Sequence, residues 1–124
     1  MQRNELIQQI RTKQSCLCVG LDTDPEKLPS TFSIRDARAM ADFNKAIIDA
    51  TLDHCVSYKI NTAFYEALGA AGWAAMEETV NHIPGSHFKI ADAKRGDIGN
   101  TSGQYAKAFF ETLPFDAKIG RAHV

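Results

Sequence analysis

The sequence lacks a long apolar run, and it lacks an excess of charge of either sign. Its 124 residues carry a net charge of −1, from 14 basic and 15 acidic side chains. No stretch approaches the roughly 20 apolar residues of a membrane span. The polar segment Met1–Lys13 has no apolar centre like that of a secretory signal. These absences argue against nucleic acid or a membrane as a partner, and they predict a cytoplasmic protein.

Cysteine is also scarce, with only Cys16, Cys18 and Cys55. An odd count of scattered thiols is a poor disulfide framework, which again favours the cytoplasm. Cys16 and Cys18 are two residues apart in an apolar run, so we expect them to pack together in a buried strand rather than to bind metal. The four histidines have no ligand-like spacing either. The sequence therefore predicts no metal site.

Helical and strand-like segments alternate along the chain. Helices are expected at Asn4–Thr12, Asp36–Leu52, Thr62–Leu68, Trp73–Ile83 and Gly99–Thr112, and strands at Ser15–Leu21, Cys55–Ile60, His87–Ala93 and Phe115–Ala117. The crossovers are long enough for parallel pairing, so the fold class is α/β, and the length suits one domain. Periodicity alone does not separate an open doubly wound sheet from a closed eight-stranded barrel.

Polar residues end each of the first three predicted strands, and this feature favours the barrel. Asp22 follows the first strand, Lys59 and Asn61 end the second, and Asp92 and Lys94 end the third. A (β/α)₈ barrel builds its active site from such positions. A complete barrel needs about 250 residues. We therefore expect a partial barrel with roughly the first three βα units and the start of strand four.

The segment Asp92-Ala93-Lys94-Arg95-Gly96-Asp97 is the strongest candidate for chemistry. Residues two apart in a strand point the same way, so Asp92 and Lys94 should project together, with Asp97 following in a turn released by Gly96. Neighbouring carboxylates favour a charged lysine, and a charged lysine held by a carboxylate can act as a general acid. A surface ion-pair cluster would show the same spacing. Spacing alone does not name a reaction.

Three longer motifs resemble one family. Phe88–Thr101 (FKIADAKRGDIGNT) resembles the Asp-x-Lys-x-x-Asp signature of the orotidine 5′-phosphate decarboxylases. Cys18–Pro25 (CVGLDTDP) and Tyr58–Gly69 (YKINTAFYEALG) resemble that family's first two strands, in its long bacterial branch. The resemblance runs from about Cys16 to Ala117. It implies a (β/α)₈ barrel that converts orotidine 5′-monophosphate to uridine 5′-monophosphate and CO₂ in pyrimidine biosynthesis, without a metal or cofactor.

The resemblance also implies catalytic and substrate-binding roles. Lys94 would protonate C6 of the pyrimidine as CO₂ leaves, and Asp92 would lie against the substrate carboxylate and hold Lys94. Asp22 and Lys59 would contact the ribose hydroxyls.

A homodimer with a shared active site is a further implication. Asp97, with Ile98 and Thr101, would reach into the site of the partner subunit.

Two departures from the family pattern qualify these expectations. The phosphate-binding loops of the later strands, including an arginine, are absent. Residues 119–124 read like translated sequencing adapter, and with Lys118 added the expected division is a decarboxylase part at 1–117 and a non-native tail at 118–124. We expect the 124-residue chain to be inactive and poorly stable alone.

Two alternative functions remain open. One is a sugar-phosphate decarboxylase or aldolase of the same barrel superfamily, whose members share the signature but usually bind magnesium. The other is a non-catalytic α/β module that binds a ligand at the strand ends.

Overall fold

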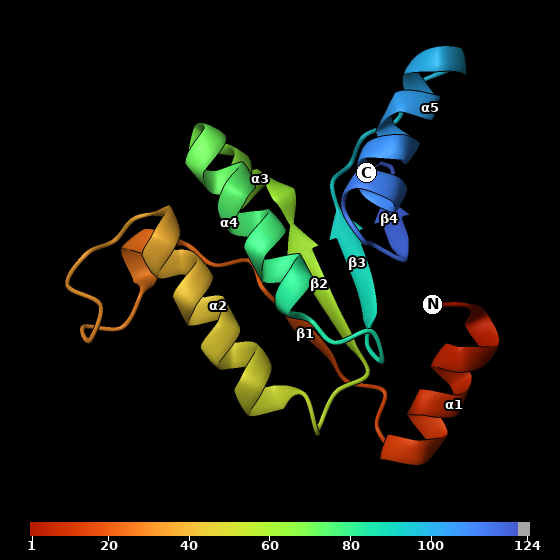
Figure 1. Ribbon diagram of the computed structural model, residues 1–124, viewed down its shortest axis with the longest axis horizontal. Helices are drawn as coiled ribbons and strands as arrows, with labels where there is room; N and C mark the ends of the chain where they lie inside the picture. The colour runs from red at the N-terminus through yellow and green to blue at the C-terminus, as the bar shows by residue number, and fades with distance from the viewer. Residues whose placement is uncertain (122–124) are drawn as a thin grey trace.

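The computed structural model describes residues 1–121 as four strands with helices between them (Figure 1). The helices are α1 (Arg3–Lys13), α2 (Ala37–Thr51), α3 (Thr62–Glu66), α4 (Gly69–His82) and α5 (Gly99–Lys107), with a 3₁₀ turn η1 (Pro25–Lys27) and a π-helical turn η2 (Ala108–Thr112). The strands are β1 (Cys18–Gly20), β2 (Ser57–Asn61), β3 (Phe88–Asp92) and β4 (Ala117–Ile119).

The strands form one parallel sheet in the order β1-β2-β3-β4, which is also their order in the chain. Gly20 pairs with Lys59, Lys59 with Ile90, and Asn61 with Asp92. In a parallel sheet all strands end at the same edge, so the segments that follow β1, β2 and β3 meet there. This register positions the candidate site.

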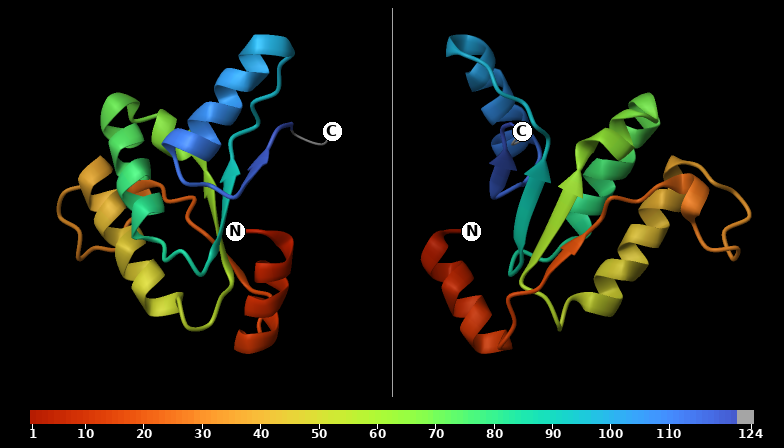
Figure 2. Two further views of the ribbon diagram at one scale, coloured as in Figure 1. Left: turned by 45° about the vertical axis from the view of Figure 1, so that its right-hand side comes forward. Right: turned by 180° about the vertical axis from the view of Figure 1, so that it is seen from behind.

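Within residues 1–121, helices cover one face of the sheet and leave the other face open (Figure 2). Helices α2 and α4 pack side by side over one face (Figure 2). Side chains on that face are buried, namely Tyr58, Ile60, Lys89 and Ala91, and those that alternate with them are only partly buried, namely Lys59, Asn61, Ile90 and Asp92. The apolar core therefore lies between the sheet and its outer helices.

Local sequence explains where the helices begin and what they bury. The Asp36 carboxylate accepts a hydrogen bond from Ala39 N at 2.8 Å and caps α2, which buries Met40 and Ile48 fully. Helix α5 buries none of its residues and continues into η2, where Phe109 enters the core.

The predicted segments are all present, with shifted ends. The first strand, expected over 15–21, covers only Cys18–Gly20, and the fourth begins at Ala117 rather than at Phe115. The helix expected from Trp73 begins four residues earlier, at Gly69, whose φ is 61°. Strand ends depend on a neighbour to pair with, which periodicity does not contain.

The expected burial of Cys16 and Cys18 is wrong. Both are exposed, whereas Cys55 is buried. Cys16 precedes β1, and Cys18 shares the uncovered face with Gly20 on the strand that forms one edge of the described sheet. A short apolar run predicts a strand that is buried on both faces, but this strand is covered on one face only.

No helix within residues 1–121 is both long enough and apolar enough to span a membrane.

Candidate active site

Four charged side chains meet at the carboxyl edge of the sheet. Asp22 follows β1, Lys59 lies in β2, Asp92 ends β3, and Lys94 lies two residues beyond it. Lys59 and Asp92 are on the uncovered face, so their side chains project away from the helices that cover the sheet. The sequence prediction that polar strand ends converge is confirmed.

These four side chains alternate in sign. Lys59 Nζ lies 2.8 Å from each carboxylate oxygen of Asp22 and 3.7 Å from Asp92 Oδ2. The other oxygen of Asp92, Oδ1, accepts a hydrogen bond from Lys94 Nζ. Asp92 therefore sits between two ammonium groups and orients both of them. We call Asp22, Lys59, Asp92 and Lys94 the charge array.

Exposure differs along the charge array. The Asp92 side chain is 11% exposed and that of Lys94 is 44% exposed. The carboxylate is thus fixed in a shielded position, while the lysine that it holds reaches the open side of the strand edge. A ligand that approached this edge would meet Lys94 as an accessible proton donor.

The turn after β3 differs from the prediction. The sequence predicts that the flexible backbone of Gly96 forms this turn, but the residue in the left-handed region is Lys94 itself, with φ 49°. A lysine with positive φ is strained, and such residues concentrate at functional sites. Lys94 N donates to Ile119 O at 2.7 Å. The backbone pairing of β3 with β4 therefore extends to Lys94, the residue that carries the ammonium group.

Support for the array comes from residues that sequence reasoning did not single out. Tyr65 OH donates to Leu21 O at 2.9 Å and accepts from Asn44 Nδ2 at 2.9 Å. Burial raises the pKa of Tyr65, so its hydroxyl stays protonated as a donor. Tyr65 thus fixes the backbone beside Asp22. No sequence signal distinguished this tyrosine from an ordinary core aromatic.

Asn61, one of the polar residues that end the second strand, links two parts of the site. Its backbone N–H donates to Asp22 Oδ1 at 3.2 Å, and its side chain accepts from Ala63 N at 3.2 Å. The same residue therefore positions a carboxylate of the array and caps α3.

Asp97, Ile98 and Thr101 lie outside the charge array. All three are exposed, Ile98 by 86%, and Asp97 Oδ1 accepts a hydrogen bond from Ile98 N at 2.8 Å. Asp97 forms no ion pair within residues 1–121, and the role expected for it stays a prediction. Within the described residues Lys94 pairs with the Asp92 carboxylate, and Asp92 has Lys59 as a second cationic neighbour.

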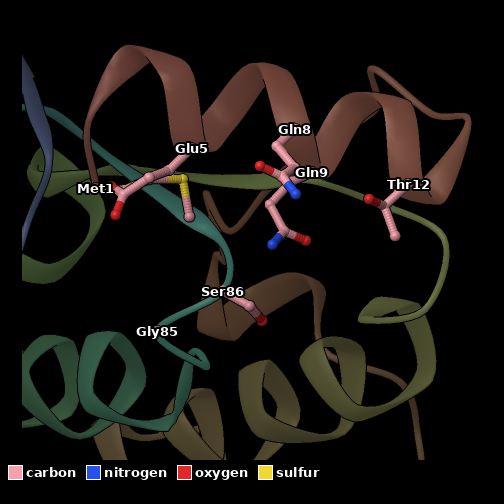
Figure 3. Close-up of a pocket in the computed structure, with 7 residues that line it drawn as sticks. All are labelled: Met1, Glu5, Gln8, Gln9, Thr12, Gly85 and Ser86. Carbon is pink, nitrogen blue, oxygen red and sulfur yellow. The ribbon is translucent and has the colours of Figure 1, made fainter.

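Two hollows lie near the ends of the sheet. Asp22, Phe43 and Phe64 line one of about 480 Å³ beside the charge array. Another, of about 420 Å³, lies at the opposite end, between α1 and the turn at Gly85 and Ser86 (Figure 3). Of the charge array only Asp22 lines the first hollow, whose other walls include Phe43 of α2 and Phe64 of α3.

Comparison with known proteins decides the family. The sequence model of the "Orotidine 5'-phosphate decarboxylase / HUMPS family" matches residues 15–121. The chain belongs to this family. The chain is 55% identical over 120 residues to the orotidine 5'-phosphate decarboxylase of Christiangramia forsetii and 52% identical to that of Bacteroides fragilis. Each match covers 94% of this chain but only 44% and 43% of the relative, so the chain spans less than half of their length.

Solved structures agree with the fold. A protein of Toxoplasma gondii matches with a TM-score of 0.85 at 37% identity, over 93% of this chain and 38% of that one. Leishmania donovani OMP decarboxylase matches with a TM-score of 0.78 at 36% identity, over 93% of this chain and 42% of that one. The predicted fold class, part of a (β/α)₈ barrel of this decarboxylase family, is confirmed.

The predicted division at residue 117 stays a prediction. Ala117–Ile119 forms β4, and the family match runs to residue 121. Residues 122–124 of the predicted tail lie outside the described residues.

Proposed function

We propose that this chain supplies the charged strand ends of an orotidine 5′-phosphate decarboxylase, which converts orotidine 5′-monophosphate to uridine 5′-monophosphate and CO₂ in de novo pyrimidine biosynthesis. The charge array is the observation that supports this most directly. Its exposed lysine is fixed by a shielded carboxylate, at the barrel edge where this family of folds carries its chemistry.

In the proposed reaction the bond between C6 and the carboxylate carbon breaks, and its electron pair stays on C6. CO₂ leaves, and Lys94 Nζ delivers a proton to C6. The developing negative charge is poorly delocalised in the ring, so a fixed cation beside C6 supplies the stabilisation. Asp92 holds Lys94 and faces the departing carboxylate, and the side chains alone carry the reaction without a metal or cofactor.

Asp22 and Lys59 are proposed to bind the ribose hydroxyls. Both Asp22 oxygens face Lys59 Nζ at 2.8 Å, so the pair offers a donor and an acceptor at one point.

Asp97, Ile98 and Thr101 are proposed to complete the site of a partner subunit in a homodimer. Their exposure, and the large apolar surface of Ile98, support this role. The three free cysteines support the further proposal of a cytoplasmic enzyme.

The decisive variant is Lys94→Ala in a completed barrel. We define the completed barrel as residues 1–117 of this chain continued by the corresponding C-terminal part of the Christiangramia forsetii relative. Turnover should fall at least about a thousandfold because the cation at C6 is lost, while binding of uridine 5′-monophosphate survives. CO₂ release and calorimetric binding measure the two effects. Lys107→Ala, on the exposed end of α5, is the control and should retain turnover.

Other outcomes identify the alternative functions. Substantial CO₂ release by Lys94→Ala would refute the proton-donor role. A requirement for magnesium would favour a sugar-phosphate decarboxylase or aldolase. Nucleotide binding with no CO₂ release from the unaltered completed barrel would favour a non-catalytic module.

A further inference from the structure

Glu66 and Arg95 join the loops that follow β2 and β3. Glu66 ends α3, and Arg95 lies just after β3, next to Lys94. Glu66 Oε2 forms an ion pair with the Arg95 guanidinium, and both side chains are largely shielded, with exposures of 28% and 29%. The second carboxylate oxygen, Oε1, is buried and accepts no hydrogen bond within residues 1–121. A buried oxygen without a partner is costly, so Glu66 is held here for its contact with Arg95.

The same guanidinium also bonds to the backbone next to Lys94. Arg95 Nη1 donates to Ala93 O at 2.8 Å, while Nη2 faces Glu66. Ala93 and Arg95 flank Lys94, so this bond closes a tight turn around the one residue of that turn with a positive φ, 49°. A strained lysine keeps such a backbone only when its surroundings impose it. Arg95 supplies that constraint, and Glu66 holds Arg95.

We propose that Glu66 and Arg95 are positioning residues that aim the Lys94 ammonium at the reacting carbon. This inference rests on the proposed decarboxylase function. Neither residue belongs to the charge array, and they act through the backbone of Lys94. Arg95 donates from two nitrogens of one planar group, to the Ala93 carbonyl and to the Glu66 carboxylate. A lysine ammonium in this place would not reach both acceptors with a fixed geometry.

The first test is Arg95→Lys in the completed barrel. The value of kcat should fall about 10- to 100-fold, because displacement of a catalytic group by about 1 Å has an effect of that size. The value of KM should stay within about threefold, because the ribose-binding pair is untouched. Arg38→Lys is the matched control, since Arg38 forms ion pairs with Asp42 and Glu78 on the outer helices, and it should leave kcat unchanged. An Arg95→Lys enzyme with unchanged kcat would overturn the proposal.

A charge-swapped double variant, Glu66→Arg with Arg95→Glu, separates positioning from stability. It can restore an ion pair, but a glutamate at position 95 cannot donate to Ala93 O. The melting temperature should therefore recover relative to either single variant, while kcat stays low. Recovery of kcat together with the melting temperature would show that the pair is only structural.

A readout without turnover keeps this inference distinct from the proposed function. Hydrogen exchange at the Lys94 amide of the completed barrel should accelerate at least about tenfold in Arg95→Lys and not in Arg38→Lys, because loss of the bond from Arg95 to Ala93 O loosens this turn. If the unaltered completed barrel released no CO₂, the proposed function would fail. Unchanged exchange at Lys94 would refute the positioning role whether or not CO₂ is released.

Discussion

His87 is a single residue whose protonation is coupled to the docking of α1. Its ring is buried, and Nε2 lies 2.7 Å from Lys13 Nζ at the end of α1 and 2.8 Å from Leu52 O. Lys13 Nζ also donates to the carbonyl oxygens of Leu52 and Cys55, at 2.7 and 3.0 Å. A neutral ring can accept a hydrogen bond from the Lys13 ammonium at Nε2, whereas a charged ring would repel that ammonium. Neutral His87 therefore helps to hold α1 at the base of the sheet.

We predict acid destabilisation that depends on His87. Burial, together with the charge of Lys13, lowers the pKa of His87 below its ordinary 6.5. Between the lowered pKa and 6.5 the unfolded chain binds more protons than the folded chain. Stability therefore falls as the pH drops through this window, and the full contribution of the neutral ring is present above it. The melting temperature should therefore decline from pH 7 to pH 5, and His87→Gln should flatten the decline. His54→Gln, at an exposed position, is the control, and an unchanged slope in His87→Gln would contradict the prediction.

Between elements, the approach of α4 to α3 depends on one glycine. A Cβ at Gly72 would lie 1.8 Å from Tyr65 O and 2.7 Å from Tyr65 C, both backbone atoms that cannot move aside. Tyr65 is also the residue whose hydroxyl holds the backbone before Asp22. The packing of two outer helices and the geometry of the charge array are therefore linked.

We predict that Gly72→Ala is destabilising by about 3 kcal/mol or more, at the upper end of overpacking effects, since backbone must shift. Gly103→Ala within α5, where an added Cβ meets nothing within 4 Å, should instead stabilise by about 0.5–1 kcal/mol through helix propensity. Urea unfolding of the completed barrel measures both changes. Similar stabilities for the two variants would show that α3 and α4 can separate without cost.

At the scale of the whole molecule, one face of the sheet has no helical cover. Phe88 and Ile90 are partly buried there, and Ile119 is 38% exposed. Exposed apolar surface of this kind, bordered by an open strand edge, promotes association.

We predict that the 124-residue chain alone is poorly stable and inactive. It should bind a hydrophobic dye and form species larger than a dimer in light scattering, while the completed barrel should do neither, because added strands cover the same face. Soluble, monomeric 124-residue material with decarboxylase activity would contradict this directly.

The sequence by itself determined the order of elements, the parallel α/β class and the strand ends that carry charge. Apolar runs, helix caps such as Asp36 and the long crossovers contain that information locally. It also determined that Asp92 and Lys94 lie close together, because two residues of one short segment cannot separate far.

Tertiary structure decided which charges pair and which face is covered. Lys59 bridges Asp22 and Asp92 because the register places three strands side by side, and that register is not visible in any one segment. The positive φ of Lys94 and the exposed position of Asp97 were likewise decided by the backbone after β3. Side-chain partners across strands depend on pairing and backbone torsion, whereas periodicity reports only which side of its own strand a residue occupies.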